Sequence, residues 1–170
     1  VLQLKFIVMA LGGALFEELL FRGYAFQRAV QAMGRWGAIA AFGLLFSLAH
    51  MPGGAELDAP MLLVAVAGLF LDCVIQSLIL LRTGSLALPF GLHFAWNWLQ
   101  QALGFGVSGT TTIPGWFRPE LGDHPGWLTG GAYGLEASMP ALVVQVGLLT
   151  WLLRTAPSAP SLAKHPPVPV

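Results

Sequence analysis

The sequence predicts an all-α protein, a polytopic bundle of about five transmembrane helices. Of its 170 residues, 56% are hydrophobic and 9% are charged, whereas soluble domains carry about 25% charged residues. The mean hydropathy is +0.73. Five apolar segments reach, or nearly reach, the about 20 residues that one membrane crossing needs. These segments are residues 4–28, 36–55, 61–81, 85–105 and 137–153.

Residues that interrupt helices separate these segments. The breaks fall at Gly34, at Pro52 to Gly54, at Pro60, at Gly84 and in the stretch 104–134, which is rich in glycine and proline. We interpret residues 1–154 as one membrane-embedded core, which further helices could precede in a longer parent chain. Residues 155–170 are rich in proline and are expected to form a disordered tail.

Charged side chains divide between two sides if the segments alternate in direction. One side carries Arg28, Arg35, Arg82, Arg154 and Lys164, and the other carries Glu56, Asp58, Glu120, Asp123 and Glu136. Lys5 and Arg118 are exceptions. The positive-inside rule makes the basic side cytoplasmic and places the carboxyl terminus in the cytoplasm. The formal net charge is zero, so no basic surface indicates a nucleic-acid partner.

Four polar residues are expected at a common depth: Glu17, His50, His93 and Asn97. Counted from presumed cytoplasmic ends at Arg28, Trp36 and Gly84, they lie about 14–21 Å inward at 1.5 Å per residue. An ionisable group in hydrocarbon costs about 2.5–3.5 kcal/mol on insertion scales and usually faces a polar cavity. The pattern therefore predicts a shared wet cavity near mid-membrane.

The first polar cluster is the pair Glu17 and Glu18 with Arg22. On a helix Glu18 and Arg22 are four residues apart and can pair, whereas Glu17 points about 100° away. Glu17 is thus left to act as a general base in a site of low dielectric constant. The alternative is a helix end at the lipid interface.

The other two clusters are Phe46 with His50, and His93 with Asn97. Each pair has a spacing of four residues and shares one helix face. Phe46 would form a wall of the cavity, and an imidazole beside an amide suits binding of an oxyanion. The alternative is hydrogen bonding between membrane helices, in which His and Asn often take part.

Together these motifs, EExxxR, FxxxH and HxxxN in that order, resemble the CPBP family of intramembrane proteases. That family includes the eukaryotic type II CAAX prenyl endopeptidase and bacterial proteins called Abi or lysostaphin-resistance-like. The segment LRTGSLALPFGLHFAWNW resembles the family's third-motif segment, and WLTGGAYGLEAS resembles a loop of bacterial members. The resemblance covers about residues 10–153 and implies a bacterial cytoplasmic membrane protein.

The resemblance implies roles for the motif residues in a cavity open to the cytosol. Glu17 would activate water with help from His50, while His93 and Asn97 would stabilise the oxyanion. Glu18 and Arg22 would hold the first helix in place. The substrate would be a membrane protein or lipidated peptide, CAAX-like by analogy with the eukaryotic relatives.

Asp72 lies outside the motifs, about 15 Å from Arg82 along its segment. It is expected either to tune Arg22 or a histidine or to make a structural hydrogen bond. Residues 106–136, which contain Trp116, Phe117, Trp127 and Tyr133, are interpreted as a connector along the outer membrane interface, because aromatic rings prefer that level.

Zinc is an alternative to a metal-free mechanism, since Glu17, His50 and His93 form a known ligand set. The HExxH arrangement is missing from the sequence, and Asn97 beside His93 suits oxyanion binding better. We therefore favour a metal-free glutamate protease without a cofactor.

Two other functions stay open. One is a non-proteolytic immunity or binding protein of the same fold. The other is a proton-coupled transporter that uses Glu17, Asp72 and the histidines as a relay, although no internal repeat supports it.

Overall fold

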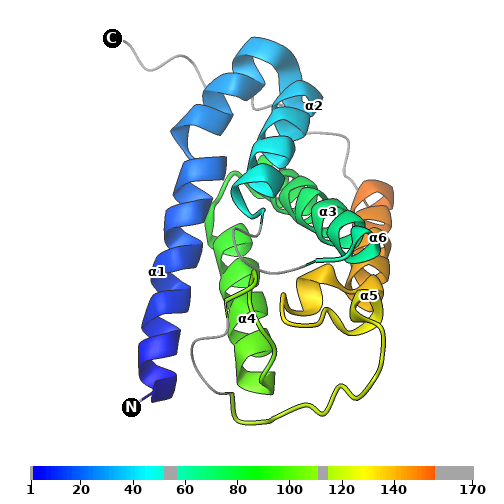
Figure 1. Ribbon diagram of the computed structural model, residues 1–170. Coiled ribbons are helices and arrows are strands. Elements are labelled where there is room, and N and C mark those ends of the chain that lie inside the picture. The colour runs from blue at the N-terminus through cyan, green and yellow to red at the C-terminus, as the bar shows by residue number, and fades with distance from the viewer. Residues whose placement is uncertain (1, 52–56, 111–114, 156–170) are drawn as a thin grey trace.

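Helices are the main elements of the ranges that the computed structural model describes, which are residues 2–51, 57–110 and 115–155 (Figure 1). Five long helices dominate: α1 (Leu2–Arg22), α2 (Tyr24–Ala49), α3 (Ala59–Thr83), α4 (Ala87–Leu103) and α6 (Met139–Arg154). Two short elements precede α6: α5 (Gly126–Thr129) and the 3-10 helix η1 (Leu135–Ala137). The predicted tail, apart from Thr155, lies outside the described residues.

A helix lies at each of the five predicted segments, but the first boundary differs. The apolar stretch 4–28 was expected to be one helix; instead α1 ends at Arg22 and α2 begins at Tyr24. α2 then kinks at Gly34, whose φ of 77° favours glycine. Arg28 therefore belongs to α2, and the depth inferred for Glu17 from Arg28 was wrong.

The number of membrane crossings is not confirmed. Among the described helices, only α3 is both long and apolar enough to span a bilayer, with a mean hydropathy of 2.3 over its best window. α6 is apolar but shorter. The all-helical class is thus confirmed, while the five-span bundle stays a prediction.

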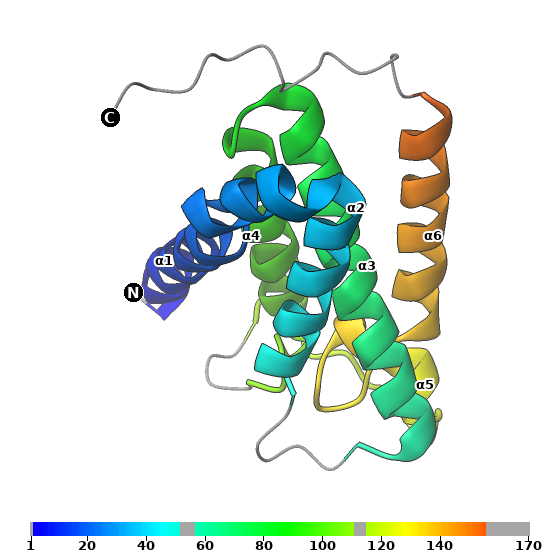
Figure 2. The ribbon, with the colours of Figure 1, turned by 90° about the horizontal axis from the view of Figure 1, so that it is seen from above.

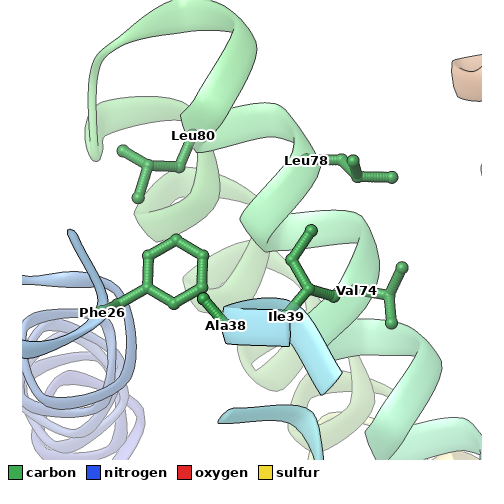
Figure 3. Packing of buried hydrophobic residues seen from close by; sticks show 6 residues of the cluster. All are labelled: Phe26, Ala38, Ile39, Val74, Leu78 and Leu80. Atoms are coloured by element: carbon green, nitrogen blue, oxygen red, sulfur yellow. The ribbon is translucent and has the colours of Figure 1, made fainter. Parts of the chain in front are cut away.

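α3 is the centre of the bundle. It packs against α2 on one side and α6 on the other, while α1 lies along α4 and also contacts α2 (Figures 1 and 2). A buried cluster joins α2 to α3 and consists of Phe26, Ala38, Ile39, Val74, Leu78 and Leu80 (Figure 3). Ile75 and Ile79 of α3 pack on Leu152 of α6. These two clusters hold α2, α3 and α6 together.

Side-chain caps set where α3 and α6 begin. The carboxylate of Asp58 accepts a hydrogen bond from the backbone N–H of Met61, at 2.8 Å. The hydroxyl of Ser138 accepts one from the N–H of Ala141, at 3.3 Å. Both helices have a proline in the first turn, where the missing N–H costs nothing. The hydroxyl of Ser138 also donates a hydrogen bond to the backbone oxygen of Leu135, at 2.7 Å, within the segment that carries Glu136.

The segment between α4 and α6 is not only a connector along the outer interface. Trp116 and Phe117 are exposed, as expected there, but Tyr133 and Glu136 are buried. The hydroxyl of Tyr133 donates to the backbone carbonyl of His50, at 2.9 Å. At Gly68 of α3 an added Cβ would lie 2.9 Å from the backbone oxygen of Glu136, so only glycine allows this approach. The segment therefore packs onto α3 and reaches the polar cluster.

Candidate active site

Three predicted side chains from three helical elements converge. The carboxylate oxygen Oε2 of Glu17 lies 3.3 Å from Nε2 of His50 and 3.6 Å from Nε2 of His93. Glu17 comes from α1, His50 directly follows α2, and His93 comes from α4. The spatial convergence expected from the motifs is therefore present.

Glu18 anchors this arrangement through hydrogen bonds to Arg22 and His93. Its Oε1 accepts hydrogen bonds from Nη1 of Arg22 at 2.6 Å and from Nδ1 of His93 at 2.9 Å. Glu18 and Arg22 are both fully buried. The Glu18–Arg22 pair expected from the spacing exists, and it also orients an imidazole, which the sequence did not indicate.

The neighbours of each imidazole determine which of its two ring nitrogens carries the proton. Nδ1 of His93 faces the Glu18 carboxylate, and Nδ1 of His50 lies 2.9 Å from the backbone oxygen of Phe46. These partners are acceptors, so each Nδ1 carries the proton. Each Nε2 then faces Glu17, and it can donate to that carboxylate only when the imidazole holds a second proton. Glu17 and the two imidazoles consequently share protons.

Aromatic packing fixes the imidazoles in place. The ring of Phe46 lies against that of His50 with 4.2 Å between centroids, and it meets Phe21 edge-on at 5.0 Å. The guanidinium of Arg22 lies 5.2 Å from the centroid of Phe46, within the range of a cation–π contact. Phe46 is 2% exposed and lines the cavity, as predicted for a wall.

His50 and His93 line a cavity with a volume of ≈ 30 Å³. Such a space holds about one or two water molecules. Asn97 and Asp72 line it together with His50 and His93. Asp72 also faces Arg22, with 4.0 Å between Oδ2 and Nη2. Asn97 is thus placed at the cavity, and Asp72 contacts the residue that it was expected to tune.

Sequence reasoning missed several lining residues. Glu136, Ser108, Gln145 and Trp96 also line the cavity. Glu136 was assigned to the outer surface by its charge, yet its Oε1 accepts from Gln100 at 2.9 Å and its Oε2 from Ser108 at 3.0 Å. The sequence offered no signal for this burial, because a carboxylate in a glycine-rich stretch such as WLTGGAYGLEAS is usually solvated.

The zinc alternative was tested on the donor set. Within the described ranges no group of three His, Cys, Asp or Glu side chains is arranged to hold a metal ion. The two imidazole Nε2 atoms lie 3.3 and 3.6 Å from one oxygen of Glu17, and two ligands of a tetrahedral zinc ion bound at about 2.0–2.1 Å lie about 3.3 Å apart. The metal-free mechanism therefore stays a prediction.

One comparison with known proteins gave a match. A family model described as type II CAAX prenyl endopeptidase Rce1-like matches residues 2–99, more than half of the chain. The matched region includes all three motifs, from Glu17 to Asn97. No curated protein and no solved structure matches.

Replacing Glu18 by Gln is expected to destabilise the protein by about 3–5 kcal/mol, because it removes the nearest counter-charge of a buried guanidinium. The matched control is Glu17→Gln, next to it on α1. Because Glu17 is only partly buried and Gln still offers hydrogen bonds to the imidazoles, the control should unfold close to the wild type. Thermal unfolding in detergent micelles measures both. Equal melting temperatures for the two variants would contradict the anchoring role of Glu18.

Proposed function

The chain belongs to the type II CAAX prenyl endopeptidase Rce1-like family, a family of integral membrane proteases, and from this premise we propose that it is an intramembrane endopeptidase in which Glu17 activates water. The observation that supports this most directly is the contact of Glu17 with His50 and His93, two imidazoles that line a cavity sized for about one or two waters. A carboxylate beside two imidazoles can accept a proton from water, which general-base hydrolysis of an amide requires.

The first step is attack by water on the scissile carbonyl carbon. Glu17 takes one proton from the water, and Nε2 of His50, 3.3 Å from the same carboxylate oxygen, shares that proton. The hydrogen bond from Nδ1 of His50 to the Phe46 carbonyl keeps the reactive nitrogen turned toward Glu17. The water is thus held between its base and the substrate carbon.

The second requirement is stabilisation of the negative oxygen that forms. Nε2 of His93 and the side-chain amide of Asn97 supply the donors, one helical turn apart on α4. Glu18 stabilises the charged form of His93 through Nδ1, so that Nε2 carries a proton to donate. Preorganised donors of this kind contribute about 2.7–4 kcal/mol each to transition-state binding.

The substrate class follows from the family. We assign a membrane-associated protein, CAAX-like in that its scissile bond lies near a lipid-anchored or membrane-embedded end. The protein acts in a cytoplasmic membrane of bacterial type with its carboxyl terminus in the cytoplasm, as the basic residues at that side indicate. The mechanism proposed is metal-free, because Asn97, one helical turn from His93 on α4, suits the binding of an oxyanion.

Glu17→Gln is expected to abolish cleavage, since the amide cannot accept a proton from water at neutral pH. The measurement is a comparison of peptide termini in membranes that contain the wild type and in membranes that contain the variant. The wild type should produce termini that the variant does not.

Equal sets of termini would remove the support for proteolysis and favour a non-proteolytic binding or immunity protein, which tolerates the loss of Glu17. Glu120→Gln is the control, because Glu120 is exposed and remote from the motifs in sequence. It should cleave like the wild type.

Activity is expected to persist after metal removal. The purified protein, treated with chelator and shown by elemental analysis to be free of zinc, should cleave at the rate of the untreated protein. Loss of cleavage that returns on addition of zinc would overturn the metal-free mechanism while leaving proteolysis intact.

A further inference from the structure

The cavity is also lined by a carboxyl group, that of Glu136, which takes no part in the attack by water or in the stabilisation of the oxyanion. Glu136 belongs to η1, is 9% exposed, and shares the cavity wall with His50, His93 and Asn97. It differs from Asp72 at the same cavity, which faces Arg22. Within the described ranges, Glu136 forms no ion pair with a cationic side chain.

The surroundings of Glu136 favour its neutral form. Burial raises the pKa of Glu136 above its ordinary value, although the hydrogen bonds from Gln100 and Ser108 act in the opposite direction. A carboxyl group buried without a cation holds its proton to higher pH. Glu136 therefore holds its proton to a higher pH than an exposed glutamate does, and it does so at the wall of the cavity that His50 and His93 also line.

The position of this acid is well fixed. Gln100 of α4 and Ser108 each donate to one oxygen of Glu136. Its backbone oxygen packs over Gly68 of α3, and the neighbouring Tyr133 donates to the carbonyl of His50. Both carboxyl oxygens are thus held from the protein side, and the cavity is where a proton donated by the group can go.

Cavity size limits what Glu136 can meet. A volume of ≈ 30 Å³ accepts about one or two waters. A water molecule in the cavity is therefore a group that this acid can reach.

We propose that Glu136 donates the proton that the leaving amine nitrogen takes up when the peptide bond breaks. The inference rests on the proposed function. Water adds its oxygen to the carbonyl carbon and gives one proton to Glu17. The C–N bond then breaks, its electron pair stays on nitrogen, and the proton of Glu136 binds there.

The products are a carboxylic acid and an amine, and the enzyme is left with a protonated Glu17 and an ionised Glu136. Transfer of the Glu17 proton to Glu136 through water in the cavity restores the starting state. No oxidant, reductant or further reactant is needed. Glu17 and Glu136 thereby act as base and acid on the two sides of one bond.

The test uses leaving groups of different quality. A peptide that spans a cleavage site found by the terminus comparison is prepared as the amide and as a nitrophenyl ester, whose leaving group departs without a proton. Glu136→Gln should lose amide cleavage by about 100-fold or more, the usual contribution of a general acid, and keep ester cleavage within a few-fold of wild type. Glu17→Gln should lose both activities, and Glu120→Gln neither.

Each result decides the proposal. Wild-type amide cleavage by Glu136→Gln overturns it, and so does an equal loss of amide and ester cleavage, which indicates a structural role. If membranes with wild type and Glu17→Gln show the same termini, the proposed function itself fails, an outcome distinct from an unaffected Glu136→Gln in an active protease.

A wild-type measurement covers the case in which Glu136→Gln does not fold. Because the acid form of Glu136 does the work and its pKa is raised, amide cleavage is sustained below this pKa and declines as the pH rises through it. The ratio of amide to ester cleavage should therefore fall with rising pH. A ratio that stays constant overturns the proposal.

Discussion

The buried contact among Glu18, Arg22 and His93 is the constraint on which the site depends. One carboxylate oxygen accepts from a guanidinium of its own helix and from an imidazole of α4. Charged partners in a medium of low dielectric constant attract strongly, and each is costly to leave alone. The contact therefore sets how α1 meets α4, and it turns Nε2 of His93 toward Glu17. This contact occupies Glu18 and leaves the adjacent Glu17 to face the imidazoles.

Polar groups around the cavity are arranged in two sets with different environments. Glu17 contacts His50 and His93, whereas Glu136 is held by neutral donors, the amide of Gln100 and the hydroxyl of Ser108. Two carboxyl groups whose surroundings differ in this way take different protonation states at one pH. Asp72 lies at the same cavity but is tied to Arg22, so the network that anchors α1 extends to α3.

Much of this could be predicted from the sequence, for physical reasons that also explain what was missed. Helical spacing alone placed Glu18 beside Arg22 and His93 beside Asn97, because residues four apart share a face. The break at Gly23 was missed since the apolar run continues through Tyr24 and Phe26, and composition does not reveal a turn of this kind. Glu136 was misplaced because a charge between glycines is usually solvated; only tertiary packing over Gly68 buries it.

Histidine-selective nitrogen NMR of the protein in lipid tests the convergence of the three helices most directly. The account predicts that Nδ1 is protonated in both His50 and His93, and that Glu17→Gln shifts the Nε2 resonances of both rings while leaving Nδ1 of His93 bound to Glu18. An unprotonated Nδ1 in His93, or Nε2 resonances that do not respond to the change at Glu17, would contradict it.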